Sequence, residues 1–115
     1  MQSAAIIVAA GRGVRAGGET PKQYQMLRGR SVLARTLAAF STHPRIAQIV
    51  VVIAPGDEAL FARALGPATE GVTCVIGGES RDASVKAGLA AVWDGMQAVL
   101  IHDAARPLLR AALID

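Results

Sequence analysis

The chain has 115 residues, which is enough for one domain with its own core and too few for two. Its hydrophobic content is 52%, but the longest apolar runs, 4–10 and 49–54, are far shorter than the roughly 20 residues that cross a bilayer, so we expect no membrane partner. The net charge of +3 suits an anionic partner, yet aromatic residues make up only 3%, which favours a small anionic ligand over nucleic acid.

Four short apolar runs along the chain predict buried strands. Their near-continuous hydrophobicity is typical of a parallel sheet that is covered on both faces. The runs are residues 4–9, 48–54, 72–76 and 98–102. The single cysteine, Cys74, lies in the third run, where we expect a buried structural thiol. One cysteine, together with an N-terminus that has no basic residue before its apolar run, predicts a cytoplasmic protein.

Helical patterns separate these runs. The first helix is expected to begin at Ser31, a good N-cap, with Leu33, Leu37 and Phe40 on its apolar face. The second helix is expected over 57–65. The third should start near Ser80 or Asp82 and present one apolar stripe of Val85, Leu89, Val92 and Trp93. The alternation predicts a single domain over 1–115, an α/β fold with a doubly wound and mostly parallel sheet.

Three unusual segments each follow a predicted strand directly. They are residues 10–22, 77–84 and 102–107. In open parallel sheets, ligands bind beyond the carboxyl ends of the strands. We therefore expect the three segments to meet at one edge of the sheet and to form the binding site there.

The first of these segments combines glycines with cations. Gly11 and Gly13 allow the backbone to wrap closely around an oxyanion, and Arg12, Arg15 and Lys22 supply positive charge. The spacing also fits a dinucleotide fingerprint, but no acidic residue lies about 20 positions further on, as a nicotinamide site requires. Without a Gly-Lys-Ser/Thr ending, the segment is not a P-loop either.

The other two segments suggest further ligand contacts. Gly77 and Gly78 precede the start of the third helix, where polar or anionic ligand atoms can bind. Asp103 follows a buried strand and could hold Mg²⁺ that bridges phosphates. Arg106 could grip a phosphate with two hydrogen bonds or cap the sheet edge. We expect His102 to be a packed or backbone-bonded histidine and not a catalyst.

Together these motifs resemble the 2-C-methyl-D-erythritol 4-phosphate cytidylyltransferase family. The resemblance covers residues 4–108. It rests on Ala9-Ala10-Gly11-Arg12-Gly13-Val14-Arg15, Pro21-Lys22-Gln23-Tyr24, Gly77-Gly78 with Arg81, Ser84-Val85, and His102-Asp103-Ala104-Ala105-Arg106-Pro107. The family has a Rossmann-like nucleotidyltransferase fold, and the resemblance implies transfer of a cytidylyl group from CTP to 2-C-methyl-D-erythritol 4-phosphate, with release of pyrophosphate, in the non-mevalonate isoprenoid pathway.

The resemblance also implies a role for each matched residue. Arg15 and Lys22 would stabilise the transition state at the α-phosphate. Asp103 would place Mg²⁺ and the acceptor, and Arg106 would reach the acceptor phosphate across a dimer interface. The contacts to CTP would come from Ala9, Ala10, Gly11, Gly13, Gly78 and Ser84, with Gly78 near the base. The partners implied are CTP, the acceptor and, at full length, a second copy of the chain.

Two departures from the family pattern bear on this interpretation. The family usually has aspartate directly before Ser84, where this chain has Ala83 and carries Asp82 one place earlier. The family's domain also continues well past Asp115, so we expect a truncated sequence, from a monofunctional enzyme or from a fusion with 2-C-methyl-D-erythritol 2,4-cyclodiphosphate synthase, and we do not expect this chain alone to be active. Alternatives are a ribitol 5-phosphate cytidylyltransferase, a sugar-phosphate nucleotidyltransferase with another base preference and a non-catalytic nucleotide-binding fragment.

Overall fold

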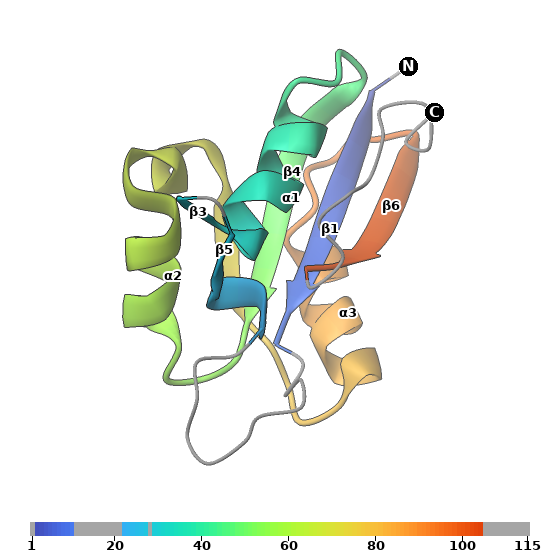
Figure 1. Cartoon of the computed structure of the whole chain (residues 1–115). Coiled ribbons are helices and arrows are strands. Elements are labelled where there is room, and N and C mark those ends of the chain that lie inside the picture. The colour runs from blue at the N-terminus through green and yellow to red at the C-terminus, as the bar shows by residue number, and fades with distance from the viewer. Residues whose placement is uncertain (1, 11–21, 28, 105–115) are drawn as a thin grey trace.

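The computed structural model of the chain describes residues 2–10, 22–27 and 29–104, with only the backbone of Lys22 and Leu27. Four parallel strands form the main sheet, in the order β5-β4-β1-β6 (Figure 1). Their bounds are Ser3–Ala9 (β1), Ile46–Ile53 (β4), Thr73–Ile76 (β5) and Ala98–Asp103 (β6). The four strands predicted from the sequence are therefore confirmed, each within two residues at either end.

The strand β1 lies at the centre of the sheet and is buried along its whole length. It pairs with β4 from Ser3 opposite Ile46 to Ala9 opposite Ile53, and with β6 as far as Val8 opposite Asp103. A strand that is covered on both faces needs apolar side chains at every position, which explains the continuous run of Ala, Ile and Val.

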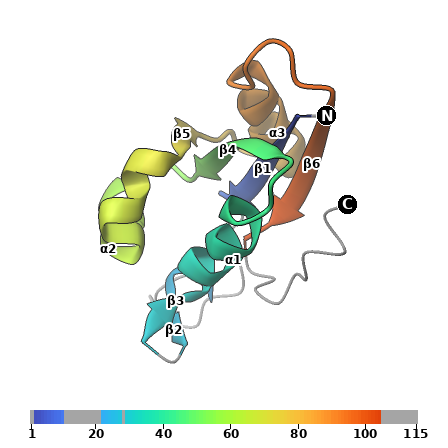
Figure 2. The same cartoon turned by 90° about the horizontal axis from the view of Figure 1, so that it is seen from above.

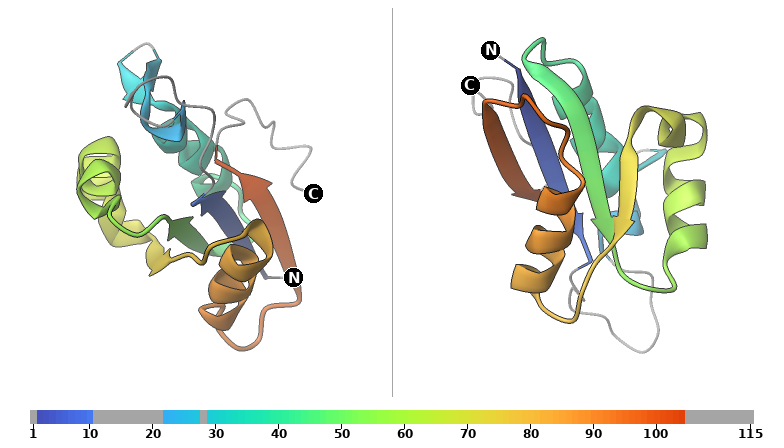
Figure 3. Two further views of the ribbon diagram at one scale, coloured as in Figure 1. Left: turned by 90° about the horizontal axis from the view of Figure 1, so that it is seen from below. Right: turned by 180° about the vertical axis from the view of Figure 1, so that it is seen from behind.

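Helices cover both faces of this sheet (Figures 2 and 3). The helices α1 (Val32–Ser41) and α2 (Glu58–Leu65) pack on one face, where the larger cluster of buried side chains includes Ile7, Phe40 and Val51. The helix α3 (Arg81–Ala90) packs on the other face, over a smaller cluster that contains Ile6 and Val52. The doubly wound arrangement is confirmed. No helix among the described residues is long and apolar enough to span a membrane.

Hydroxyl side chains cap two of the helices as the sequence predicts. At the start of α1, the Oγ atom of Ser31 accepts a hydrogen bond from the backbone N–H of Ala34 at 3.0 Å. The same hydroxyl donates to the carbonyl of Ala64 in α2 at 3.2 Å, so the cap also links two helices. Ser80 caps α3 in the same way, accepting from the N–H of Ala83 at 3.0 Å.

Several short elements have no counterpart in the sequence-based prediction. A 3-10 turn, η1 (Lys22–Tyr24), leads into an antiparallel hairpin of β2 (Met26–Leu27) and β3 (Arg30–Ser31). A second 3-10 segment, η2 (Gly66–Gly71), follows α2. Two-residue strands and single turns contain too few residues to show a period of 2 or 3.6, so the pattern of apolar residues does not reveal them.

The apolar stripe predicted for the third helix is only partly correct. Val85 and Val92 pack against the sheet, but Leu89 and Trp93 are 45% and 57% exposed. The buried face of α3 is formed by Ser84 and Gly88. A Cβ atom on Gly88 would lie 2.8 Å from Cγ2 of Ile6, so the missing side chain lets the helix approach the sheet closely. Close approach through small residues therefore decides which way the helix faces.

The prediction that Cys74 is buried is wrong. Its side chain is exposed, because β5 is an outer strand of the described sheet and none of its side chains is fully buried. Partial burial, and then the nearby carboxylate of Glu58, raise the pKa of the Cys74 thiol. An apolar run shows that a segment is a strand, but it does not distinguish a central strand from an outer one.

Candidate functional site

The predicted segments that the structure describes do meet at the carboxyl edge of the sheet. The chain proceeds from β1 to β4 and β5 on one side and then returns to place β6 on the other side of β1. Such a reversal leaves a crevice beyond the carboxyl ends of the strands, and ligands bind there in open α/β folds. The segments after β1, β5 and β6 all begin at this carboxyl edge (Figure 3).

The ends of β1 and β5 are packed together without room for extra atoms. The N–H of Gly77 donates to the carbonyl of Ile53 at 2.7 Å, which extends the β4–β5 pairing. A Cβ atom on Gly77 would lie 2.5 Å from Oγ of Ser84 and 2.8 Å from Cβ of Ala10. Glycine is required here because three segments converge on its Cα atom. Ala10 and Gly77, far apart in the sequence, thus form one continuous surface.

Ser84, in α3, packs against the backbone of this surface. Its side chain is 2% exposed, and its Oγ atom accepts a hydrogen bond from the N–H of Gly78 at 3.2 Å. Because Ser84 belongs to α3 and its hydroxyl binds this N–H, the helix fixes the backbone conformation of Gly78. Ala83, at the position where the family usually has aspartate, would collide with any side chain on Gly78. The Gly78 position is therefore closed to larger residues.

The carboxylate of Asp103 lies at the end of β6 and faces the start of α3. Its Oδ1 atom is 3.5 Å from Nε of Arg81, and the two side chains are 40% and 58% exposed. An ion pair this exposed contributes little to stability, so both groups keep charges that a ligand can recruit. The sequence motif included Arg81 but gave it no role; its position opposite Asp103 could be found only from the fold.

Two contacts fix the segment around Asp103. The rings of His102 and Phe40 lie 5.5 Å apart at a tilt of 56°, which confirms His102 as a packed side chain. The fully buried hydroxyl of Thr36, in α1, donates to the carbonyl of Ala104 at 3.3 Å and to that of Val32 at 3.1 Å. The residues on either side of Asp103 are therefore held by α1, and the carboxylate itself remains at the surface.

A glutamine that the sequence-based site assignment left out joins the first segment to the sheet. The Nε2 atom of Gln23 donates to the carbonyl of Ala9 at 2.8 Å, and the side chain is only 3% exposed. This contact places η1, and with it the backbone of Lys22, at the carboxyl end of β1. In the sequence, Gln23 appears only as a polar residue between Lys22 and Tyr24. A hydrogen bond to a backbone carbonyl fourteen positions away produces no periodic pattern, so the sequence does not reveal this contact.

The described structure does not cover every predicted site residue. Its residues include Ala9, Ala10, Gly78, Ser84 and Asp103, and it brings the segments that carry them together at one edge. Four predicted residues and the side chain of Lys22 lie outside what is described. The four are Gly11, Gly13, Arg15 and Arg106.

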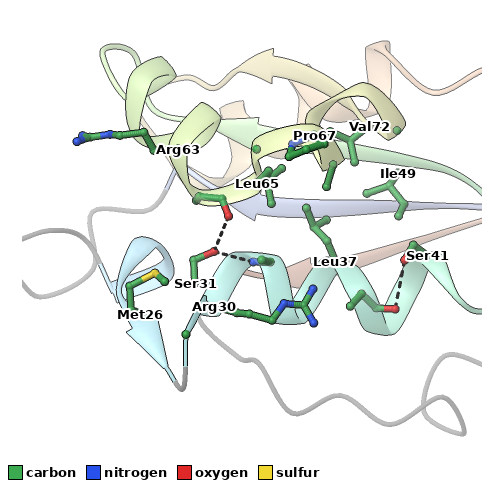
Figure 4. A pocket seen from close by; sticks show the side chains of 17 residues that line it. Met26, Arg30, Ser31, Leu37, Ser41, Ile49, Arg63, Leu65, Pro67 and Val72 are labelled. Carbon is green, nitrogen blue, oxygen red and sulfur yellow. Dashed lines mark hydrogen bonds between the residues drawn. The ribbon is translucent and has the colours of Figure 1, made fainter.

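A separate groove lies away from this edge. It has a volume of about 660 Å³ and runs between α1 and the α2–η2 segment, over a floor that includes Leu37, Ile49 and Leu65 (Figure 4). The Ser31 hydroxyl bridges its two walls through the carbonyl of Ala64 (Figure 4). No predicted site residue with a described side chain lines this groove, so the groove is separate from the candidate site at the sheet edge.

A metal ion at the sheet edge would need ligands beyond the side chains that the structure describes. No group of three or more His, Cys, Asp or Glu side chains gathers within residues 2–10, 22–27 and 29–104. Asp103 is a single, partly exposed carboxylate at the sheet edge. Mg²⁺ in nucleotide sites is commonly bound through one or two carboxylates together with substrate phosphates and water. The donor set therefore fits a Mg²⁺ ion that arrives with a triphosphate.

Known proteins resemble this chain over nearly all of its length. It is 55% identical over 115 residues to the 2-C-methyl-D-erythritol 4-phosphate cytidylyltransferase of Cereibacter sphaeroides, covering 99% of this chain and 51% of that protein. It is 52% identical over 114 residues to the bifunctional enzyme IspD/IspF of Mesorhizobium japonicum, covering 97% of this chain and 28% of that one. The chain thus spans about half, or less, of the curated relatives it matches.

A solved structure of a similar protein has the same fold as this chain. The 4-diphosphocytidyl-2C-methyl-D-erythritol synthase of Anaerococcus prevotii is 31% identical, with a TM-score of 0.79 over 98% of this chain and 47% of that one. The family model of 2-C-methyl-D-erythritol 4-phosphate cytidylyltransferase, IspD, matches residues 3–115. With that match, the ordered motifs and the shared fold, the chain belongs to the IspD family of cytidylyltransferases.

Proposed function

We propose that this chain is the CTP-binding part of an enzyme that transfers a cytidylyl group from CTP to 2-C-methyl-D-erythritol 4-phosphate. The products would be 4-diphosphocytidyl-2-C-methyl-D-erythritol and pyrophosphate. The observation that carries the proposal is the meeting of Ala10, Gly77 and Ser84 at the reversal point of the sheet, with Asp103 on the next strand, in a chain of this family.

The shape of the edge suits a nucleotide. Gly77 and Gly78 let the backbone lie close to Ala10 and Ala83, where any side chain on either glycine would clash, and Ser84 holds the backbone of Gly78 in place. Small residues let a planar base and its ribose come close to backbone groups, and backbone N–H and C=O groups can then read the base edge. On this proposal Ala9, Ala10, Gly11, Gly13, Gly78 and Ser84 contact CTP.

The chemistry needs little beyond positioning and charge. The attacking group is a phosphate monoester whose second pKa is near 6, so it is largely ionised at neutral pH and needs no general base. Negative charge that builds up around the α-phosphate must be neutralised. We assign this role to Lys22, whose backbone lies beside the end of β1, and to Arg15. Arg106 would hold the acceptor phosphate.

Magnesium is part of the proposal. When bound, Mg²⁺ would neutralise phosphate charge, and on this proposal the partly exposed carboxylate of Asp103 would hold it. Arg81 would lose its weak contact with Asp103 in that event and become free to meet a phosphate or ribose oxygen. We also propose that the full-length protein is a cytoplasmic homodimer, as the resemblance implies.

The test is turnover by a protein of the relatives' length that carries this chain, called the full-length protein below. Pyrophosphate release from CTP and Mg²⁺ is measured with 2-C-methyl-D-erythritol 4-phosphate and, separately, with ribitol 5-phosphate. We expect release with the first acceptor. Turnover only with ribitol 5-phosphate would establish the sister activity, and absence of both turnover and CTP binding would leave a non-catalytic nucleotide-binding fold.

A further inference from the structure

Two buried residues hold the segment that follows the predicted phosphate loop. Gln23 is 3% exposed and Tyr24 is 5% exposed, and the tyrosine belongs to the core cluster beneath α1. A little further on, the carbonyl of Gln25 accepts a hydrogen bond from the N–H of Val32 at 2.9 Å, at the start of α1. The chain is thus anchored immediately after Lys22, and these anchors fix the backbone from which the Lys22 side chain leaves.

The anchor at Gln23 uses a carbonyl that lies beyond the β1–β6 pairing. This pairing ends at Val8, whose carbonyl accepts from the N–H of Ala104 at 3.0 Å. The next carbonyl along the strand, that of Ala9, accepts from Nε2 of Gln23 at 2.8 Å. A side-chain amide therefore takes up a backbone acceptor at the very end of β1, beside the surface formed by Ala10 and Gly77.

The geometry of this bond links two parts of the site. One partner, Ala9, is the last residue of the central strand, and the other directly follows Lys22, fourteen positions along the chain. A lysine side chain is a point charge on a four-carbon stem, so the position of its backbone decides where the charge can reach. Displacement of about 1 Å can lower turnover on the order of a hundredfold.

We propose that Gln23 is a positioning residue for cytidylyl transfer and acts by fixing Lys22 against the carboxyl end of β1. The amide N–H donates to the Ala9 carbonyl, and this bond fixes the backbone of Lys22 relative to the predicted CTP contacts at Ala9 and Ala10. The inference rests on the proposed function, because it assigns to Lys22 the charge that stabilises the transition state.

A double-mutant cycle in the full-length protein tests the proposal. The variants are Lys22→Ala, Gln23→Met and the double substitution; methionine is close to glutamine in size but cannot donate to the Ala9 carbonyl. We expect Gln23→Met to lower kcat roughly tenfold to a hundredfold, and the KM for CTP to change less than about threefold. The double variant should be no slower than Lys22→Ala, because Gln23 has no effect once the ammonium group is gone. Losses that multiply would overturn the proposal.

Gln48 supplies a matched control. It is also a glutamine and also 3% exposed, but it lies in the first half of β4, and its Nε2 atom donates to the carbonyl of Ala91 at 3.0 Å. Any effect of Gln48→Met on kcat should multiply with that of Lys22→Ala, since a purely structural glutamine has no specific link to the lysine. Non-additivity as strong at Gln48 as at Gln23 would reduce both to general stabilisers and overturn the proposal.

A further variant, Gln23→Glu, covers the case in which Gln23→Met does not fold. In Gln23→Glu, the carboxyl group can donate to the Ala9 carbonyl only when it is protonated, and burial raises the pKa of a carboxyl group. We expect kcat of this variant, relative to wild type, to rise as the pH falls from 8 to 6. A ratio that does not change with pH, in protein shown to be folded by circular dichroism, would contradict the proposal.

The outcomes separate this proposal from the proposed function. If wild type does not transfer the cytidylyl group, the proposed function fails, whatever Gln23 does. If wild type is active and Lys22→Ala is slow, but the losses at Gln23 and Lys22 multiply, the function stands and only the positioning role of Gln23 is lost.

Discussion

The two edges of the sheet use the same side chain for different purposes. At the carboxyl edge, the buried amide of Gln23 reaches one carbonyl, beside a surface of glycine and alanine. Toward the amino edge, the amide of Gln48 bonds to Thr73 in β5, to the carbonyl of Ala91 and, through Oε1, to the N–H of Trp93 at 2.8 Å. At the first edge, the described residues that meet are small. At the second edge, one glutamine joins a strand to the end of α3.

This difference indicates that the carboxyl edge positions the candidate site, whereas the amino edge stabilises the fold. The amino edge closes the connection after α3 with several hydrogen bonds, whose loss would weaken the whole fold. Among the described residues of the carboxyl edge, hydrogen bonds to the side chains of Gln23, Thr36 and Ser84 hold backbone groups in place. Substitutions at the carboxyl edge should therefore affect turnover more than stability, and substitutions at the amino edge should do the opposite.

The largest effect is expected at the carboxyl edge. In the full-length protein, Lys22→Ala should lower kcat by roughly 10²–10³, the loss typical of one group that stabilises a transition state. Steady-state assays with CTP and 2-C-methyl-D-erythritol 4-phosphate measure it, and urea unfolding should show no matching loss of stability. A purified variant with unchanged turnover would remove Lys22 from the mechanism.

At the amino edge the effect should appear in stability. Gln48→Met leaves the Trp93 N–H and the Ala91 carbonyl without their partner. Gln48→Met also removes the bond to Thr73, and each of the three lost hydrogen bonds is worth about 0.5–1.5 kcal/mol, so we expect the free energy of unfolding to fall by about 2–4 kcal/mol. Urea denaturation measures this, and kcat at a temperature where the variant is folded should be close to that of wild type. A large loss of kcat without loss of stability would contradict the expectation that the amino edge serves stability and not turnover.

The helix α3 runs between the two edges and packs closely on the sheet. Loosening this packing should have a smaller effect on stability and on the KM for CTP. In Gly88→Ala, the new methyl group would lie 2.8 Å from Cγ2 of Ile6 and 3.0 Å from Cγ2 of Val52. Such overpacking should lower the free energy of unfolding by about 1–3 kcal/mol. If the helix shifts outward to make room, Ser84 moves away from Gly78, and we expect the KM for CTP to rise.

Gly71→Ala is the control for this substitution. A Cβ atom at Gly71 would meet nothing within 4 Å, so this variant should match wild type in both unfolding and KM. If Gly88→Ala left stability and the KM for CTP at wild-type values, α3 would be free to move away from the sheet without consequence, and its role as a rigid support for Ser84 would have to be abandoned.

The sequence predicted the strands, the three long helices and the shared edge because each rests on a local pattern. The apolar runs, the caps at Ser31 and Ser80, and the rule that strand ends meet at one edge sufficed to place Asp103 near Gly77 and Ser84. These features depend on neighbouring residues or on topology alone, so a single sequence reveals them.

What the sequence did not reveal depends on contacts between distant residues. The bond from Gln23 to Ala9, the pair of Arg81 and Asp103, and the approach of Gly88 to Ile6 all join different elements. The burial of Cys74 was predicted wrongly for the same reason, since its exposure follows from the position of β5 at the outside of the described sheet. Such contacts exist only once the elements are assembled.

Cys74 lies in β5, and its reactivity offers the smallest effect. Partial burial, followed by the carboxylate of Glu58, raises the thiol pKa above its ordinary value, so little thiolate is present at pH 8 and alkylation by iodoacetamide should be slower than for a model thiol. Glu58→Gln removes the lesser cause and should speed alkylation by no more than about threefold, since partial burial remains. Turnover should stay at the wild-type value. A rate equal to that of a free thiol, unaffected by Glu58→Gln, would mean that β5 opens to solvent and that the outer strand is not a stable part of either edge.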